Sequence, residues 1–484
     1  MNWLIASPVL VPLATSMATA LLVNQRRAQQ IVSLLGAAAL LAVGCALVLA
    51  VNDGAVLRSA FGNWPEPFAI AFHIDRLSAV LILLTGLMAL ASLIFAQSDA
   101  DPGRDQPLLL PLVHGVLAGV AGAFATADLF NLYVWFEVML IAAMGVLALG
   151  GRRDQLDGTF KYLTLNLIGT LLLLIAVGSI YGATGHLNYT ALAEAAGSLS
   201  APLSVLLLSV LVLSLLLKAG AFPLFAWLPA SYHTLPAPVL ALFAGLLTKV
   251  GVYAVLRILG DVFAPVPVVL TEALGWIAAL TMLLGVLGAA YHWDIRRILA
   301  FHIISQIGYI LLAVALASAA GNAATLFYTA HHIVVKANLF LIGAIIWRLT
   351  GSYDLRLSGG LYAAKPLLGV LFLIPALSLV GIPPLSGFWA KFMILDEAIA
   401  QGRVAWTFIA LLVSVLTLYS MMKIWMEAFW RPHPNPNWQP PRNTRLAPAW
   451  IATWGLAAVT LWISFNPEPL AAFAKAAAAT LGGR

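Results

Sequence analysis

The chain of 484 residues is 62% hydrophobic and only 9% charged, whereas a soluble domain carries about 25% charged residues. Its mean hydropathy of +0.97 excludes an ordinary water-soluble globular protein and predicts a chain adapted to a lipid bilayer. The single cysteine, Cys45, lies in an apolar run, which excludes a disulfide framework and a thiolate metal site.

Fourteen segments are apolar enough to cross a bilayer, which takes about 20 residues of helix. The first has no basic residue before it and no cleavage site after it, so we expect a retained helix rather than a signal peptide. The sequence therefore predicts an all-α polytopic membrane protein. The predicted spans are 3–23, 31–51, 72–96, 107–127, 129–150, 158–181, 202–228, 236–258, 267–290, 297–318, 323–348, 366–399, 405–430 and 446–465.

Basic residues gather in the loops after odd-numbered spans, which explains the net charge of +6 without invoking nucleic acid. Short loops rich in Lys and Arg stay in the cytoplasm, so both termini are expected on the outer side of a bacterial inner membrane. The Pro-rich stretch 431–442 then becomes a cytoplasmic linker. The odd loops hold Arg26, Arg27, Arg104, Arg152, Arg153, Arg296, Arg297, Arg348, Arg356, Lys365, Arg431, Arg442 and Arg445; the even loops hold Arg58, Arg257 and Arg403.

Two spans, the seventh and the twelfth, carry the same Gly-x-x-Pro-Leu core, at 220–224 and 381–385. Proline removes a backbone donor and clashes with the preceding turn, so each helix should break there. The expected break residues are Gly220, Pro223, Gly381, Pro383 and Pro384. Interrupted spans at matching places, five helices apart, predict two repeats of inverted topology with a transport path between them.

Five ionisable residues stand far from any loop: Glu137, Lys218, Lys249, Lys336 and Lys391. A charge at the bilayer centre costs about 3 kcal/mol or more, so each is a functional candidate. Lysine can accept and release a proton where arginine cannot, and no arginine lies in the middle of a span. The row therefore predicts a proton relay.

Histidines add groups that titrate near neutral pH. His332 lies four residues before Lys336 and so shares its helix face. His331 points about 100° away, where we expect a hydrogen bond or a water pocket. His302 and His233, the latter at a turn that could form a water-filled entrance, are accessory relay candidates; a structural role is equally open for each histidine.

One carboxylate cannot neutralise four lysines. We expect Glu137 to pair with Lys218, and the other lysines to be hydrated or to share protons. Long lysines can also reach the headgroups, a reading that fits Lys161 and Lys423 but not the central row. Lys423 and Glu427, four residues apart, predict a local ion pair.

The relay residues, together with Gly62-Asn-Trp-Pro-Glu-Pro-Phe and Asp75-Arg-Leu-Ser-Ala, make the chain resemble the antiporter-like membrane subunits of complex I and Mrp antiporters, most of all the D subunit of the Mrp-type Na⁺/H⁺ antiporter. Lys391 adds to the likeness, because the M subunit of complex I typically has Glu there. The resemblance covers nearly the whole chain and implies two inverted five-helix repeats, spans 4–8 and 9–13. The divisions implied are 1–106, three N-terminal spans; 107–258, the first repeat; 267–430, the second repeat; and 431–484, linker and last span.

The resemblance also implies roles. Glu137 and Lys218 become the coupling pair, Lys249 the central relay, His332 and Lys336 its continuation, and Lys391 the exit. The expected function is proton translocation in a multisubunit Na⁺/H⁺ antiporter with other membrane subunits as partners: a transporter subunit rather than an enzyme, with no cofactor or metal. Two alternatives stay open: a proton-pumping M/N-like subunit of complex I or a membrane-bound hydrogenase, and a structural scaffold for partner subunits.

Overall fold

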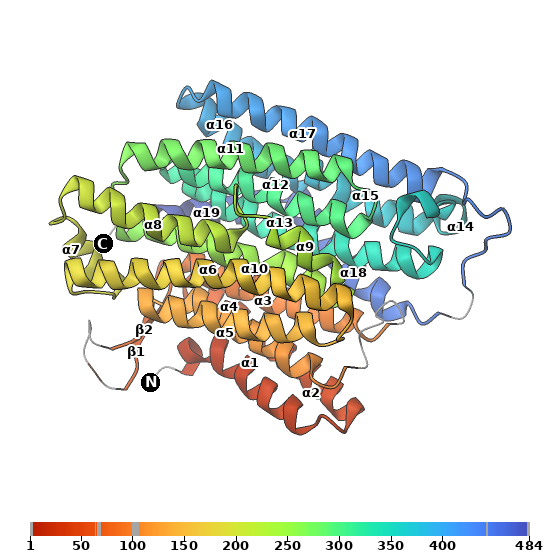
Figure 1. The fold of residues 1–484 in the computed structure, drawn as a ribbon, viewed down its shortest axis with the longest axis horizontal. Helices are drawn as coiled ribbons and strands as arrows, with labels where there is room; N and C mark the ends of the chain where they lie inside the picture. The colour runs from red at the N-terminus through yellow and green to blue at the C-terminus, as the bar shows by residue number, and fades with distance from the viewer. Residues whose placement is uncertain (1–2, 63, 65–68, 99–105, 442–443, 482–484) are drawn as a thin grey trace.

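The computed structural model describes residues 3–62, 64, 69–98, 106–441 and 444–481. In these ranges twelve helices are long and apolar enough to cross a membrane, and α4 and α15 are shorter apolar helices. The helices lie side by side in one bundle (Figure 1). The predicted helical membrane fold is confirmed, whereas the number of helices that cross a bilayer stays a prediction.

Every predicted span coincides with at least one helix. In chain order these helices are α1 (Trp3–Leu21), α2 (Arg26–Ala50), α3 (Arg76–Phe95), α4 (Leu109–Ala125), α5 (Leu129–Ala148), α6 (Arg153–Thr184), α8 (Ala201–Ala219), α9 (Trp227–Ser231), α10 (Ala237–Arg257), α11 (Val268–Tyr291), α12 (Ile295–Ala315), α13 (Ala319–Thr350), α15 (Pro366–Val380), α16 (Ser386–Ala400), α17 (Val404–Ile424) and α18 (Ala447–Phe465).

A hairpin precedes the third span, which the all-α prediction missed. Strands β1 (Leu57–Ala60) and β2 (Ala71–Ile74) pair antiparallel, so the span begins at Arg76 rather than at residue 72. Asp75 caps α3, its carboxylate accepting a 2.9 Å hydrogen bond from the Ser78 amide. An N-cap carboxylate satisfies an amide that has no partner within the helix.

The motif Gly62-Asn-Trp-Pro-Glu-Pro-Phe falls between β1 and β2. Its residues 63 and 65–68 lie outside the described residues, as do Arg104 and Arg442.

Three short α-helices lie outside the predicted spans: α7 (Tyr189–Ala196), α14 (Leu361–Ala364) and α19 (Glu468–Thr480). The last of these follows α18 and packs against α13 and α3. There are also two 3-10 helices, η1 (Tyr232–Thr234) and η3 (Leu355–Leu357), and two π-helical segments, η2 (Ile258–Val262) and η4 (Trp425–Trp430).

The structure contains both helix interruptions. Helix α8 ends at Ala219 and α15 at Val380, and each is followed by a left-handed glycine, Gly220 with φ 76° and Gly381 with φ 94°. Positive φ is nearly cost-free only for glycine. The prolines that follow cannot continue the helix, so the chain crosses each gap as irregular backbone before α9 and α16 begin.

The two halves of the bundle share a local hydrogen-bond pattern. Asp128 caps α5 and bridges to Asn188, while Asp294 caps α12 and bridges to Asp354. In the first half the Leu129 amide donates to the Leu187 carbonyl at 2.9 Å. In the second half the Ile295 amide donates to the Tyr353 carbonyl at 3.0 Å. The 32-residue helices α6 and α13 occupy the same place in these patterns, which supports two related halves.

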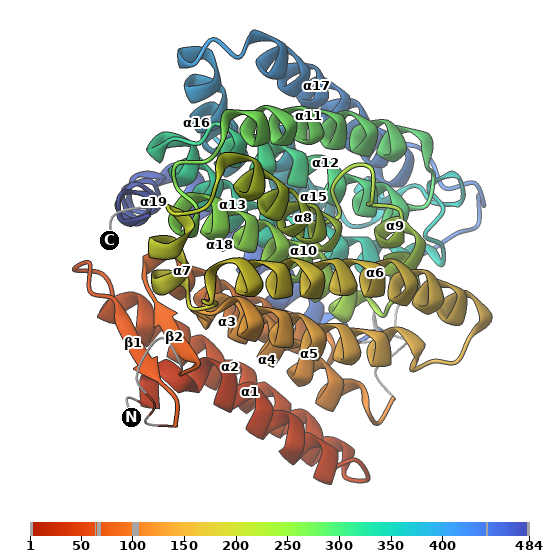
Figure 2. The ribbon, with the colours of Figure 1, turned by 60° about the vertical axis from the view of Figure 1, so that its left-hand side comes forward.

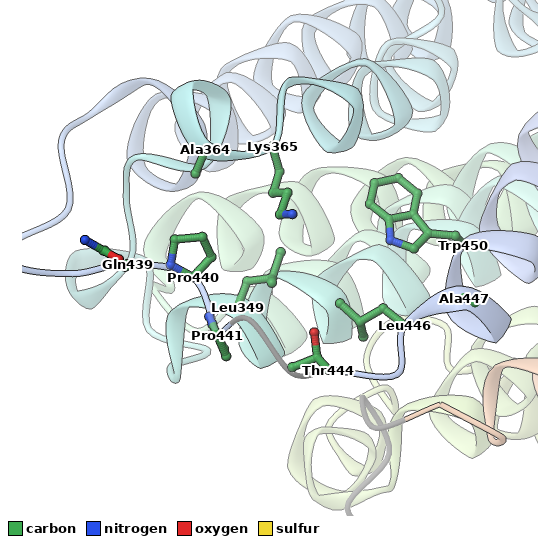
Figure 3. Close-up of a pocket in the computed structure, with 10 residues that line it drawn as sticks. All are labelled: Leu349, Ala364, Lys365, Gln439, Pro440, Pro441, Thr444, Leu446, Ala447 and Trp450. Carbon is green, nitrogen blue, oxygen red and sulfur yellow. The ribbon is translucent and has the colours of Figure 1, made fainter.

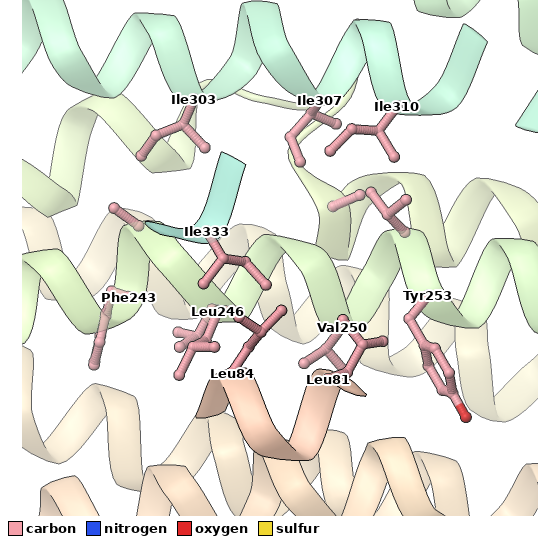
Figure 4. Packing of buried hydrophobic residues seen from close by; sticks show 14 of the residues in the cluster. Leu81, Leu84, Phe243, Leu246, Val250, Tyr253, Ile303, Ile307, Ile310 and Ile333 are labelled. Carbon is pink, nitrogen blue, oxygen red and sulfur yellow. The ribbon is translucent and has the colours of Figure 1, made fainter. Parts of the chain in front are cut away.

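Among the twelve long apolar helices, α10, α12 and α13 have the largest buried shares. They lie in the middle of the bundle in both views, with α1 and α2 at one edge and α17 at the other (Figures 1 and 2). Ile307 and Ile333 belong to the same buried cluster as Val250, which lies beside Leu81 of α3 (Figure 4). This dry packing surrounds the ionisable residues that the same helices carry.

Candidate functional site

The four lysines of the predicted row are all inside the protein. Lys249 and Lys336 are 0% exposed, Lys218 is 4% and Lys391 is 5% exposed. Glu137 differs, because its side chain is only half-buried on the surface of α5. A buried ammonium needs hydrogen-bond partners or it gives up its proton, so the surroundings of each lysine decide what it can do.

Lys218 sits at the end of α8, where the helix breaks. Its ammonium donates to the Asn166 carbonyl at 3.1 Å and to Thr170 Oγ1 at 2.6 Å, both on α6. The expected ion pair with Glu137 is wrong: among the described residues the two charges do not come within bridging distance, and Glu137 Oε1 has no hydrogen-bond partner. The α6 oxygens are the partners of the ammonium instead.

Lys249 and Lys336 come from the facing helices α10 and α13. The Lys249 ammonium donates to the carbonyl of Ala244, about one turn back along its own helix. Lys336 Nζ has no hydrogen-bond partner in the described structure and lies 5.6 Å from the Phe340 ring centroid. His332, one turn from Lys336, has neither ring nitrogen bonded to protein.

Other buried polar atoms without protein partners gather on the same three helices. Buried polar groups almost always have a hydrogen-bond partner, and water serves where the protein offers none. This part of the bundle interior is therefore where internal water is expected. The atoms are Thr248 Oγ1 on α10; His302 Nδ1, Ser305 Oγ and Gln306 Nε2 on α12; and His331 Nε2, both His332 nitrogens, Lys336 Nζ and the Asn338 amide oxygen and nitrogen on α13.

Two hydrogen bonds extend this polar interior from α12 toward its neighbours. His302 Nε2 lies 2.9 Å from Ser420 Oγ of α17. The Tyr328 hydroxyl of α13 donates to Gln306 Oε1. Polar steps thus join the centre of the bundle to α17.

Lys391 lies on α16 and bonds back across the second helix break. Its ammonium donates to the Val380 carbonyl at 2.8 Å and to Ser414 Oγ at 3.0 Å, and it lies 4.6 Å from the Tyr309 ring centroid. The Tyr309 ring stacks on Tyr328 at 5.6 Å. Lys391 is therefore linked to the α12–α13 interior through two tyrosines.

His331 leads away from the row, and the hydrogen bond expected for it is confirmed. Its Nδ1 lies 2.8 Å from Ser386 Oγ, which in turn lies 2.8 Å from Ser378 Oγ across the second break. The Ser386 amide donates to Ser464 Oγ of α18 at 2.8 Å. This branch joins α13, α15, α16 and α18.

His233 lines a cavity of about 440 Å³ beside the first break, with Asp154, Asp157, His292 and Arg297 among its walls. Because the Pro229 carbonyl can only accept, His233 Nδ1 donates to it at 3.0 Å, which leaves Nε2 to accept from Arg297 at 3.3 Å. Burial, then Arg297, lowers the pKa of His233 below its ordinary value. The ring is therefore neutral at pH 7.

The predicted Lys423–Glu427 ion pair is wrong. Lys423 donates instead to the carbonyls of Ala290, at 2.7 Å, and His292, at 2.6 Å, at the end of α11. Glu427 binds Arg431 at 2.9 Å. A cation at a helix C-terminus is favoured by unpaired carbonyls and the helix dipole, so Lys423 has a local structural partner.

The neutral oxygens that hold the row were not predicted from the sequence. Thr170 and Ser414 are polar residues inside apolar spans. Their hydrogen bonds to Lys218 and Lys391 each join two different helices. Polar residues spaced one turn apart within a span, such as Asn166 and Thr170, are the signal that could have found them.

Another hollow, of about 670 Å³, lies away from the row where α13, α14 and α18 meet a loop (Figure 3). Lys365, Pro440 and Trp450 are among its walls. No residue of the row lines it.

A bundle of apolar helices that is interrupted twice and carries buried lysines beside unpartnered polar atoms defines a membrane protein of the ion-transporting class. Residues 126–418 match the family described as NADH:quinone oxidoreductase/Mrp antiporter, transmembrane. The chain belongs to that family, which confirms the resemblance seen in its sequence, and it is a multi-pass bacterial membrane protein.

Known proteins place it further within the family. It is 37% identical to the Na⁺/H⁺ antiporter D subunit of Alkalihalophilus pseudofirmus, over 97% of this chain and 95% of that protein. The corresponding D subunit of Bacillus subtilis is 34% identical over 90% of each. A chain of the Mrp complex from Dietzia sp. matches with a TM-score of 0.91 and 33% identity, over 100% of this chain and 98% of that one. A chain of respiratory complex I from Thermus thermophilus gives 0.84 and 25%, over 99% and 100%.

Proposed function

We propose that the protein is the proton-translocating subunit of a multisubunit Na⁺/H⁺ antiporter. The names of its relatives and the Mrp complex it matches support this function. It is a transporter subunit rather than an enzyme, it works with other membrane subunits, and protons and Na⁺ are the transported ions. The proton path is the row Glu137, Lys218, Lys249, His332, Lys336 and Lys391.

One observation carries the proposal: the buried lysines bond to neutral oxygens or to nothing in the protein. Lys218 and Lys391 each have carbonyl and hydroxyl partners, while Lys336 and His332 have none among the described residues. A lysine paired tightly with a carboxylate would stay charged. A lysine held by neutral oxygens and internal water can both take up and release a proton.

The halves of the bundle divide this path. The first repeat, 107–258, supplies Glu137, Lys218 and Lys249, and the second, 267–430, supplies the remaining members. Interrupted helices near the bilayer middle support such a division, because irregular backbone is tolerated there only beside protein or a polar cavity.

Orientation follows from the basic loops. We place the Arg-rich loops in the cytoplasm and both termini on the outer side of the cell membrane. The His233 cavity then opens to the cytoplasm. It lies beside the break after α8, close to Lys218 at the end of that helix, and is the entrance for protons. The cluster around Asp75 and Arg257 lies at the outer end.

Glu137 fits a contact with a partner subunit. It is half-buried on α5, and the neighbouring helix α6 exposes large apolar side chains such as Phe160, 69% exposed, and Ile175, 59% exposed. A carboxylate on an apolar membrane-facing surface is costly unless another protein covers it. The charge on Glu137 would then couple this row of residues to the partner subunit that covers it.

The test is cation-driven proton flux in everted vesicles that contain the whole complex. Lys218→Ala and Glu137→Ala should abolish the flux while the complex still assembles on native gels. Lys475→Ala is the matched control, since Lys475 is exposed on α19 and lies outside both the row and the His233 cavity; its flux should stay within about twofold of the unchanged protein. Normal flux in an assembled Lys218→Ala complex contradicts the proposal.

The likeness to complex I supports one alternative, a proton-pumping subunit of a redox enzyme. The match in that case has lower identity, 25%, than the 33% to the Mrp complex. Purification with its natural partners decides between them: flavin or iron–sulfur subunits in the complex would favour the redox enzyme, and only small membrane subunits would favour the antiporter.

A further inference from the structure

A second polar column lies on α10 beyond Lys249, toward the outer end. Tyr253 and Arg257 follow Lys249 at intervals of one turn and are 3% exposed each. At 1.5 Å per residue, Arg257 lies about 12 Å along the helix from Lys249. Two buried polar groups in a membrane-spanning helix, which the relay does not use, need an explanation.

The facing helix carries a matching column. Thr325 and Thr329 lie on the same side of α13 as His332 and Lys336, at spacings of three and four residues. The columns meet, because a void of about 10 Å³ is lined by both threonines, Tyr253 and residues of α3. That volume approaches the space that one water molecule needs.

Tyr253 joins the column to the cluster beyond it. Its hydroxyl donates to the Phe124 carbonyl at 2.9 Å, lies 3.2 Å from Ser78 Oγ, and accepts from Arg257 at 3.3 Å. Because its single proton goes to the carbonyl, the Ser78 hydroxyl is the donor between these two. The Phe124 carbonyl cannot pass this proton on, so the Tyr253 hydroxyl relays a proton only when it turns to another acceptor.

Arg257 is shared between two carboxylates. It binds both oxygens of Asp75, at 2.7 and 2.9 Å, and one oxygen of Asp261 at 3.3 Å. The Asp75 side chain is 8% exposed and that of Asp261 is 24% exposed. The guanidinium therefore has an inner partner that it holds tightly and an outer partner within reach.

Asp75 depends on this pairing for its charge. Burial by itself would raise its pKa, but the Arg257 guanidinium holds the pKa below its ordinary range. Burial and Arg257 also lower the pKa of the neighbouring His73 to about 4, so that ring is neutral at pH 7. If Arg257 moved to Asp261, Asp75 would be a buried carboxylate without a counter-ion and would bind a proton.

We propose that Asp75, Tyr253 and Arg257 form a gated proton outlet, in which the shift of Arg257 from Asp75 to Asp261 opens a path from Lys249 to the outer side. This inference rests on the proposed proton relay. In the open state the Tyr253 hydroxyl turns from the Phe124 carbonyl to the freed Asp75 carboxylate and gives it its proton. It then takes up the proton that the Lys249 ammonium releases. When Arg257 returns, Asp75 releases that proton outward and becomes a carboxylate again.

The charged surroundings of the outlet come from several elements. They are His73 of β2, Arg58 of β1, Tyr253 and Arg257 of α10, Asp261 of η2, Tyr189 of α7 and Asp128 before α5. The Asp75–Arg257 ion pair could alternatively have a structural role, holding α3 against α10. The experiment must therefore separate proton transfer from assembly.

The test uses the whole complex in proteoliposomes, with Na⁺-driven proton flux measured while the pH on the outer face is varied. Asp75→Asn should assemble and reduce flux by at least about tenfold, since it removes the proton acceptor. Tyr253→Phe removes one hydroxyl; it should lower flux about three- to tenfold and flatten the dependence on outer pH. Glu272→Gln is the matched control, because its ion pair with Arg403 lies at the same end of the bundle; flux should stay within about twofold.

Three outcomes are decisive. Normal flux and a normal pH profile in Tyr253→Phe overturn the outlet, whether or not Asp75→Asn assembles. If Lys218→Ala abolishes flux while Asp75→Asn and Tyr253→Phe retain it, the outlet alone is wrong and the relay stands. If Lys218→Ala also retains flux, the relay and the outlet fall together.

Discussion

The ammonium of Lys391 donates a 2.8 Å hydrogen bond to the carbonyl of Val380, the last residue of α15. The lysine thus satisfies backbone that the broken helix exposes, and the missing Cβ of Gly381 makes room for it: a Cβ there would lie 2.9 Å from Lys391 Cδ. Lys391 therefore both supports the break and belongs to the proposed proton-transfer row.

Arginine at position 391 separates these two roles. Lys391→Arg keeps a donor for the Val380 carbonyl but cannot release a proton, so we expect an assembled complex whose flux is reduced by about a hundredfold or more. Lys391→Met removes both, and should also lower stability by about 1–3 kcal/mol because a buried carbonyl loses its partner. Native gels and thermal melts, run beside flux assays, check both. Flux near normal in Lys391→Arg would rule out proton transfer at this position.

The Lys218–Thr170 bond predicts a graded effect. Thr170→Val removes the 2.6 Å acceptor while keeping the shape of the side chain, so Lys218 loses about 1–3 kcal/mol of hydrogen bonding. Flux should change several-fold without being lost, because the Asn166 carbonyl remains. Thr164→Val on the exposed face of the same helix is the control. Equal flux in both variants would show that Thr170 does not hold Lys218 during transport.

Gly251 of α10, which faces the end of α8 at the first break, is expected to be essential for packing. A Cβ at Gly251 of α10 would lie 2.6 Å from the Ala219 nitrogen and 2.9 Å from its Cα, and backbone cannot yield as a flexible side chain can. Gly251→Ala should therefore destabilise the protein by about 1–3 kcal/mol. Gly178→Ala on α6 is the control, because open space surrounds that position. Melting temperatures of the two variants in detergent give the comparison; identical values would contradict the close approach of α8 and α10.

The pH dependence of the entrance follows from His233. Its lowered pKa means that the folded protein holds the ring neutral, so the stabilisation is present above the ordinary value of about 6.5 and is lost as pH falls below it. Thermal stability should decline between pH 7 and 5.5, and His233→Gln should decline less. A steeper decline in the variant would reverse the assignment.

Much of the fold could be predicted from apolar length alone, because each span needs its own run of about 20 residues. The positions of Lys218, Lys249, Lys336 and Lys391 inside the bundle followed from their distance to any loop. The hairpin was missed since each strand has only four residues, too few for a clear alternation.

Pairings across the bundle could not be predicted. Arg257 and Asp75 are 182 residues apart in sequence, and Lys218 finds its oxygens on α6 rather than at Glu137 on α5. Which of two nearby helices supplies a partner depends on how the helices rotate and pack, and single-sequence patterns do not contain that information.

Lys249 offers the most direct test of proton transfer along the buried row, because it is 0% exposed and lies where the two halves of the bundle meet. The measurement is Na⁺-driven proton flux in proteoliposomes with the purified complex, comparing Lys249→Met with Lys475→Met on the exposed face of α19. We predict that Lys249→Met assembles and loses flux by about a hundredfold or more, while Lys475→Met is unchanged. Undiminished flux in an assembled Lys249→Met complex would contradict proton movement along the row.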